Sequence, residues 1–141
     1  MLFNRSYGTR NLIFRNNYIH HFPRGLLLLA ENVTIENNRF ERIRNAAIAV
    51  GAEYGYWREA GWVENILIRG NRILDVGSSM NYDIGSYTSG AISVFCRRED
   101  YSDSFRGNRN ITISDNIIER CPGAGIFLYS AEQVTLRNNR L

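Results

Sequence analysis

A segment of nine residues occurs five times in this chain of 141 residues, and it constrains the fold more than any other feature. The copies begin at residues 11, 32, 65, 110 and 133, and the second of them reads NVTIENNRF. The second, fourth and ninth positions are apolar in every copy, whereas the fifth is mostly polar. Alternation with a period of two residues is typical of a β-strand that buries one face.

The seventh position of every copy is asparagine, and the residue before it is Asn, Asp or Gly. Asn tolerates left-handed backbone angles, and its side chain can bond to neighbouring backbone groups. We therefore expect each strand to end in a sharp corner. The corner residues are Asn17, Asn38, Asn71, Asn116 and Asn139.

A second apolar strand is predicted after each of the first four copies. These strands are expected within residues 24–29, 45–50, 89–94 and 123–128. Alignment of the four segments predicts two columns of inward side chains. The columns are Leu27, Ile48, Ile92, Ile126 and Leu29, Val50, Val94, Leu128.

Short strands separated by Asn corners, with no helical segment to return the chain, favour a coil in which each strand pairs with its equivalent one turn on. This pattern resembles the right-handed parallel β-helix of pectin lyases and related polysaccharide enzymes. The predicted fold is all-β, a right-handed parallel β-helix (solenoid) of about five turns, with long loops on turns two and three. An antiparallel sandwich or barrel is the alternative, but it does not require five copies in register.

The two ends of the chain lack the capping elements that a solenoid usually has. Residues 1–10 contain no evident cap, and the last two residues follow directly after an Asn corner. Terminal repeats of a solenoid need a covering element to hide the last strands. We therefore expect residues 1–141 to form one β-helix domain that is a fragment of a longer β-helix, or to self-associate through open ends.

Charge and hydropathy exclude several classes of partner. The net charge is +3, from 17 basic and 14 acidic residues, and the Arg residues are dispersed, so no nucleic-acid partner is expected. No apolar run is long enough for a membrane span. No signal peptide is recognised at the start, and the parent protein is expected to be extracellular or periplasmic. Cys96 and Cys121 do not make a disulfide framework.

The spacing of the copies locates the expected functional region. Successive copies start 21, 33, 45 and 23 residues apart, so the second and third turns carry insertions. Insertions on one face of a repeat protein usually build its binding face. The loops that follow Val50 and Val94 leave equivalent strands, and we expect them to be neighbours in space.

These loops concentrate aromatic and acidic side chains. Aromatic faces pack against sugar rings, carboxylates and Arg bind hydroxyl groups, and paired carboxyls can cleave a glycosidic bond. The predicted substrate-binding residues are Trp57, Glu53, Tyr56, Trp62, Arg97 and Tyr101, and the catalytic candidates are Glu59, Asp100 and Asp103. In the alternative interpretation, the aromatics cover the flank of the coil and the carboxylates are solvated or paired with Arg.

The segment Trp57-Arg58-Glu59-Ala60-Gly61, followed by 63–71, resembles part of the bacterial β-helical exo-α-1,3-galactosidases. In that family a Trp-x-Glu-Ser-Gly motif precedes the next strand, and the segment 24–27 resembles another of its strands. The resemblance implies that Trp57 and Glu59 line a sugar pocket. Ala60 replaces the motif Ser, and the adjacent Asp pair of that family is absent. A general base would then come from Asp100, Asp103 or Asp83.

No cofactor is predicted, and support for a metal is weak. Glu99, Asp100 and Asp103 offer oxygen ligands for Ca²⁺, but the sequence has no dense Asp ladder. The pair His20-His21 is interpreted as a structural corner. The sequence therefore favours a carbohydrate-active, glycoside hydrolase-like protein whose partner is a polysaccharide or oligosaccharide. The alternative is a non-catalytic β-helix fragment with a structural, self-assembling or glycan-binding role.

Overall fold

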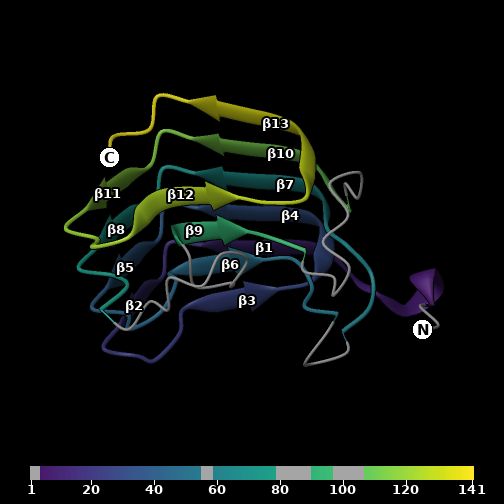
Figure 1. The fold of residues 1–141 in the computed structure, drawn as a ribbon, viewed down its shortest axis with the longest axis horizontal. Helices are drawn as coiled ribbons and strands as arrows, with labels where there is room; N and C mark the ends of the chain where they lie inside the picture. The colour runs from purple at the N-terminus through teal and green to yellow at the C-terminus, as the bar shows by residue number, and fades with distance from the viewer. Residues whose placement is uncertain (1–3, 55–58, 79–89, 97–106) are drawn as a thin grey trace.

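The computed structural model describes residues 4–54, 59–78, 90–96 and 107–141, which form three parallel β-sheets wound into a coil. Sheet A consists of β1 (Thr9–Arg15), β4 (Ala30–Glu36), β7 (Glu64–Arg69), β10 (Asn108–Ser114) and β13 (Ala131–Arg137). Sheet B consists of β2 (Tyr18–His20), β5 (Arg39–Glu41), β8 (Arg72–Leu74) and β11 (Ile117–Glu119). Sheet C consists of β3 (Leu26–Leu28), β6 (Ile48–Val50), β9 (Gly90–Val94) and β12 (Ala124–Leu128). The predicted parallel β-helix is confirmed (Figure 1).

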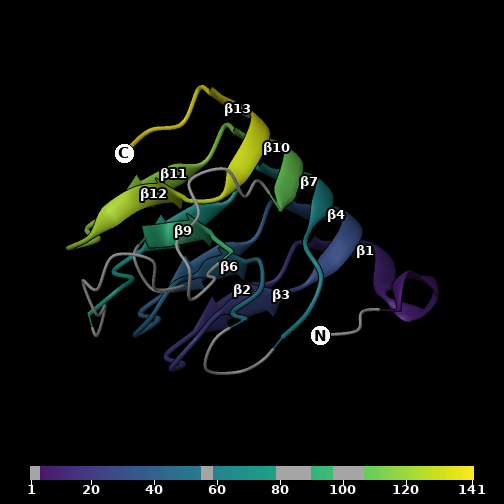
Figure 2. The same cartoon turned by 45° about the vertical axis from the view of Figure 1, so that its right-hand side comes forward.

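The strands of sheet A pair in the register that the repeat predicts. Val33 lies opposite Ile66 and Ile35 opposite Ile68, although 33 residues separate the two copies. The same register continues from β7 to β10 across a separation of 45 residues. Figure 2 shows the strands following one another from β1 to β13 along one side of the coil. The insertions therefore lie outside the paired segments and leave the stacking unchanged.

Apolar side chains from all three sheets fill the interior of the coil. Large fully buried members are Ile35, Phe40, Ile43, Ile48, Ile68, Ile73, Ile92, Ile111 and Ile113. Each of these positions recurs one turn on, so apolar columns stack into one continuous core. Burial of one such side chain contributes about 1.5–3 kcal/mol.

The register of β3 differs from the prediction. Leu26 pairs with Ile48 and Leu28 with Val50, whereas Leu27 faces outward and is 40% exposed. A run of four leucines has no alternation, so its apolar pattern cannot select a register. Gly25 decides it instead: its N–H donates to the Ala46 carbonyl, and a Cβ there would lie 2.1 Å from the oxygen of Ala47.

The seventh-position asparagines form a ladder inside the corner between sheets A and B. The Oδ1 atom of Asn71 accepts hydrogen bonds from both the backbone N–H and the Nδ2 of Asn38, each at 3.0 Å. Asn71 in turn donates from the same two groups to Asn116. These side chains are buried, so the ladder satisfies polar groups that would otherwise destabilise the core. We call this row the inner Asn ladder.

The sixth and first positions of the nine-residue repeat adopt the left-handed backbone conformation. The residue before each corner Asn has φ between 52° and 63°, as Asn16 and Gly70 do. The leading residue also has positive φ, for example 56° at Asn32 and 59° at Asn65, so each strand of sheet A bends inside its own length. The sequence predicted the first site and missed the second.

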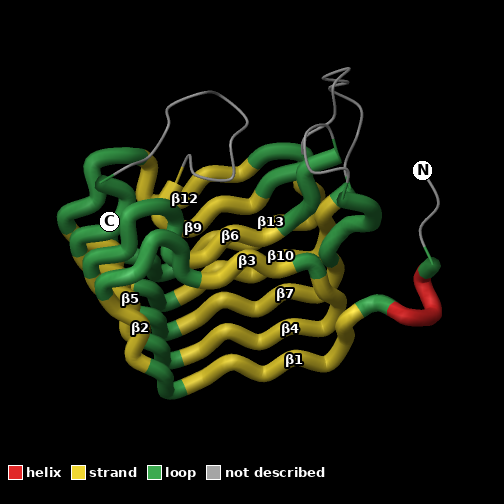
Figure 3. Tube along the Cα trace, turned by 90° about the horizontal axis from the view of Figure 1, so that it is seen from below, coloured by secondary structure: helices red, strands yellow, loops and turns green. Residues whose placement is uncertain are grey.

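The three-residue strands of sheet B were not predicted, because only their central residue repeats as an apolar position. The chain before sheet A forms a short 3₁₀ helix, Arg5–Tyr7, which lies away from the sheets (Figures 1 and 3). Within the described residues, no helix has the length and apolar character needed to cross a membrane.

Candidate functional site

The loops that follow β6 and β9 meet at their bases. The backbone N–H of Phe95 donates to the carbonyl of Val50 at 2.9 Å, so the two loops leave neighbouring strands side by side. Gly51 has φ of 124°, and a Cβ at this residue would lie 1.6 Å from the carbonyl oxygen of Phe95. Only glycine fits this contact. The predicted proximity is confirmed where the two loops leave their strands, at residues 50–51 and 95.

Asn108, at the start of β10, joins both loops from behind. Its Nδ2 donates to the carbonyl of Phe95 at 2.9 Å, and its Oδ1 accepts from the backbone N–H of Val63 at 3.3 Å. The side chain is fully buried. The side-chain amide of Asn108 therefore connects the end of the first loop to the start of the second.

Glu59 is held at the base of the first loop by a reciprocal pair of contacts with Glu53. Its Oε2 accepts the backbone N–H of Glu53 at 2.9 Å, and its own backbone N–H donates to the carbonyl of Glu53 at 3.1 Å. The Glu59 side chain is half-buried, and in the described part of the chain its Oε1 has no hydrogen-bond partner. One carboxylate oxygen thus positions the side chain through the backbone of Glu53.

Glu53 lies deeper than Glu59. It is only 5% exposed, and its backbone supplies both contacts to Glu59. The structure therefore brings these two predicted residues together, with Glu53 as the inner member. Contact of Glu53 with a ligand was predicted and stays a prediction.

Trp62 is half-buried beside the first strand that follows the loop. The guanidinium of Arg109 lies 5.9 Å from the centre of its ring, and Arg109 also approaches Glu64 at 3.5 Å. Tyr54 spans the same loop, because its hydroxyl donates to the carbonyl of Gly61. One face of Trp62 is therefore engaged by a cation, and a sugar would have to use the rest of the ring.

The remaining predicted site residues fall outside the described parts of the chain. They are Tyr56, Trp57, Arg97, Asp100, Tyr101 and Asp103, together with the alternative base Asp83. Of the predicted site, the structure brings Glu53 and Glu59 into contact and places Trp62 on the same loop.

Other carboxylates are engaged by arginine, as the alternative interpretation proposed for the acidic loop residues. Asp75 accepts two hydrogen bonds from Arg120, at 2.7 and 2.8 Å. These bonds hold the pKa of Asp75 below its ordinary value. Glu36 similarly pairs with Arg69 at 2.7 Å. The lowered pKa favours the ionised form of Asp75, and both carboxylates are bound to arginine, so they are poor candidates for proton transfer.

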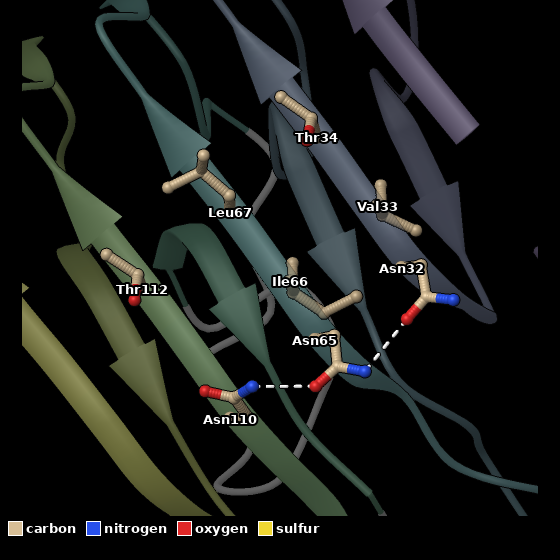
Figure 4. Close-up of a pocket in the computed structure, with 8 residues that line it drawn as sticks. All are labelled: Asn32, Val33, Thr34, Asn65, Ile66, Leu67, Asn110 and Thr112. Carbon is tan, nitrogen blue, oxygen red and sulfur yellow. Dashed lines mark hydrogen bonds between the residues drawn. The ribbon is translucent and has the colours of Figure 1, made fainter. Parts of the chain in front are cut away.

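A shallow groove on the outer face of sheet A was missed by the sequence reasoning. It has a volume of about 410 Å³ and is lined by Asn32, Val33, Thr34, Asn65, Ile66, Leu67, Asn110 and Thr112. Figure 4 shows its asparagines in a row, linked by hydrogen bonds. The leading Asn, which recurs in four of the five copies, was the available signal.

Comparison with known families settles the class of protein. Residues 59–141 match the family described as "Right handed beta helix region", and this match covers more than half of the chain. The chain belongs to the right-handed β-helix family. The family assignment agrees with the three stacked parallel sheets.

This right-handed β-helix is also similar to several galactosidases. An alpha-1,3-galactosidase B of Phocaeicola vulgatus is 27% identical over 134 residues, or 90% of the chain and 21% of that protein. One from Akkermansia muciniphila is 25% identical over 139 residues, or 93% and 16%. One from Bacteroides thetaiotaomicron is 31% identical over 119 residues, or 84% and 19%. The chain spans about a fifth of the length of these relatives. No solved structure matches it significantly.

The described residues of this β-helix include both histidines and both cysteines of the chain. Over those residues there is no cluster of three or more His, Cys, Asp or Glu side chains that could hold a metal. His21 has φ of 51° and its Nδ1 lies 2.9 Å from that of His20, as a corner pair predicts. Cys96 and Cys121 are not joined in a disulfide, and burial raises the pKa of the Cys121 thiol. The weak Ca²⁺ prediction involves Glu99, Asp100 and Asp103, which lie outside the described residues.

Proposed function

We propose that this β-helix is a carbohydrate-active protein of the glycoside hydrolase type, which acts on or binds an α-galactoside at the loops that follow β6 and β9. The observation that carries the proposal is the placement of Glu59. One oxygen of its carboxylate is fixed by the backbone of Glu53, and the other has no described partner. The names of the galactosidase relatives support the choice of ligand.

Glycoside cleavage needs two carboxyl groups, one on each side of the bond. Glu59 would act as the general acid or as a ligand for a sugar hydroxyl, and Asp100 or Asp103 would supply the second carboxyl. Glu53 acts as a positioning residue, because its N–H orients the carboxylate of Glu59. Trp57, Tyr56, Trp62, Arg97 and Tyr101 complete the proposed sugar site.

A glycan array that includes α-1,3-linked galactosides tests this proposal, with hydrolysis of the same glycans followed in parallel. The parent chain should bind α-galactosides, Glu59→Gln should remove hydrolysis, and Trp57→Ala should remove binding. Glu64→Gln is the matched control, because Glu64 lies at the end of the same loop but pairs with Arg109. Failure of the parent chain to bind any glycan would contradict the proposal.

A second candidate function, end-to-end assembly, is favoured by the polarity of the inner Asn ladder. Each asparagine donates from its N–H and Nδ2 to the next one along the chain, from Asn17 as far as Asn139. Among the described residues, Asn17 Oδ1 receives no donor and the Asn139 N–H has no acceptor. A further turn at each end of the coil would supply both, and in the proposed assembly a second copy stacked head to tail provides that turn.

A further inference from the structure

The leading asparagines form a second ladder, on the outside of sheet A. Asn32 donates from Nδ2 to Oδ1 of Asn11 at 3.1 Å, Asn65 donates to Asn32 at 2.8 Å, and Asn110 donates to Asn65 at 2.6 Å. All four have positive φ, between 52° and 59°, and all are exposed. We call this row the outer Asn ladder, and it forms one side of the groove (Figure 4).

The outer ladder leaves hydrogen-bonding capacity unused. A side-chain amide carries two N–H donors and an oxygen with two lone pairs. Asn65 uses one N–H and one lone pair within the ladder, and so does Asn32. Across the described residues, neither amide makes a further hydrogen bond. Each one therefore keeps a donor and an acceptor for a ligand in the groove.

The outward residues of the strands line the groove beside this ladder. Thr34 and Thr112 are half-buried, and their hydroxyls have no partner among the described residues. Leu67 lies between them on β7, where it faces outward and is also half-buried. The groove thus combines two hydroxyls and an apolar patch with the amides of the outer ladder.

We propose that this groove binds a neutral linear polysaccharide lying across β4, β7 and β10, along the axis of the coil. This site goes beyond the proposed function, because it uses no residue of the Glu59 loop. Adjacent strands are about 4.8 Å apart, so amide and hydroxyl groups recur at that interval along the groove. An extended polysaccharide also presents hydroxyls at regular intervals along a line, and each hydroxyl both donates and accepts.

The apolar patch fits the same ligand. The C–H face of a sugar ring is apolar, and it can pack on Leu67 while the ring hydroxyls reach the amides and threonines on either side. Burial of such a surface contributes about 25 cal/mol per Å². Packing on Leu67 favours a sugar over water, because water can bond to the polar groups of the groove but does not cover its apolar surface.

The charges around the groove favour a neutral polymer. No residue that lines it is ionisable. Carboxylates beyond its edges are paired, because Glu64 lies 3.5 Å from Arg109, Glu31 lies 3.4 Å from Arg10, and Glu36 lies 2.7 Å from Arg69. The groove therefore offers no dedicated cation to an acidic polysaccharide such as polygalacturonate.

Titration calorimetry of the 141-residue chain with xylohexaose, cellohexaose and polygalacturonate tests the proposal. Asn65→Gly removes one amide of the outer ladder and keeps a residue that accepts positive φ. Asn37→Gly is its matched control, because Asn37 also has positive φ and the equivalent residue one turn on is Gly70. We expect Asn65→Gly to weaken binding of a neutral hexasaccharide by roughly fivefold to tenfold, and Asn37→Gly to leave it unchanged.

A second pair of variants tests the hydroxyls without a change of backbone. Replacement of Thr34 and Thr112 by valine keeps their shape and removes both hydroxyls, whereas Thr135→Val changes the same column outside the groove. The double variant should weaken binding and the control should not. Equal affinities for parent and both groove variants would overturn the proposal, as would the absence of binding to any neutral hexasaccharide or a preference for polygalacturonate.

The two proposed sites can fail separately. If Glu59→Gln abolishes action on α-galactosides and leaves hexasaccharide binding intact, the groove is a distinct site. If no α-galactoside is bound but the hexasaccharide is, the groove proposal stands and the proposed function fails. Loss of hexasaccharide binding in Glu59→Gln, with no effect of the groove variants, would place the polymer at the loops and overturn the groove.

Discussion

The Oδ1 atom of Asn116 lies 2.9 Å from the backbone nitrogen of Asn71 and 3.0 Å from its Nδ2, although 45 residues separate the two asparagines. The Nδ2 of Asn71 also donates to the carbonyl of Ile35 at 2.9 Å. These contacts connect three consecutive strands of sheet A through one buried side chain. The corner of the coil is therefore stabilised by side chains as well as by the backbone.

Replacement of Asn71 by alanine should destabilise the coil by roughly 2–4 kcal/mol, because several buried partners would lose a hydrogen bond at once. Chemical denaturation followed by circular dichroism measures this change. Asn139→Ala is the control: Asn139 belongs to the same ladder but is only half-buried, at its end, so its loss should be clearly smaller. Equal losses of unfolding free energy in the two variants would contradict a larger stabilising role for the buried part of the ladder.

Replacement of Gly51 by alanine should both destabilise the chain and displace the loop bases. The added Cβ would meet the carbonyl oxygen of Phe95 at 1.6 Å, and the φ of 124° is strained for any other residue. We expect a loss of at least about 2 kcal/mol in thermal or chemical unfolding. Gly8→Ala serves as the control, since its Cβ would meet nothing within 4 Å. A Gly51→Ala variant as stable as Gly8→Ala would refute this packing.

Asp75→Asn should reduce stability at neutral pH, and this deficit should disappear in acid. Arg120 lowers the pKa of Asp75 in the folded chain, so the folded state binds that proton less readily than the unfolded state. The stabilisation is present above the ordinary carboxyl pKa and is lost as pH falls through the lowered value. Unfolding curves of parent and variant across acidic pH should therefore converge.

Glu132→Gln provides the control for that experiment. Glu132 is exposed, and the described residues include no ion pair with it. Its substitution should leave the pH profile of stability unchanged. If the difference in stability between Asp75→Asn and the parent were the same at every pH, Arg120 would not be lowering the pKa of Asp75.

Leu136→Lys should weaken the proposed end-to-end association. Leu136 belongs to an inward column of sheet A, yet it is 50% exposed, because β13 is the last strand of the sheet among the described residues. A charge there would oppose stacking of a second copy. Light scattering after size-exclusion chromatography should show larger species for the parent, and fewer for the variant, at equal concentration.

The control for that variant is Leu67→Lys, which places the same charge on the outward face of β7, the middle strand of sheet A. It should not alter association, because the outward face takes no part in stacking. A monodisperse monomer of the parent chain would reject end-to-end assembly altogether.

Much of the architecture could be predicted from the repeat, because each turn must bury the same apolar positions and make the same corner. Columns such as Val33 and Ile66 had to be inward, and the seventh-position Asn had to mark a corner. The register of β3 could not be predicted in this way, since Leu26 and Leu27 are equally apolar. There, the close approach of Gly25 to Ala47 decided the pairing.

The candidate site was predictable as a region but not as a geometry. The breaks in repeat spacing indicated that the loops after Val50 and Val94 are neighbours, because equivalent strands stack. The orientation of Glu59 depends on the backbone of Glu53, and no residue pattern specifies that contact.

The sequence by itself therefore determined the coil, since apolar columns and asparagine corners repeat in register and have one common way to be buried. Only the tertiary structure decided what the leading asparagines do. Their positive φ turns the side chains outward, and stacking of the turns brings Asn32, Asn65 and Asn110 within hydrogen-bonding distance. The outer Asn ladder and its groove exist only once residues from separate turns are side by side.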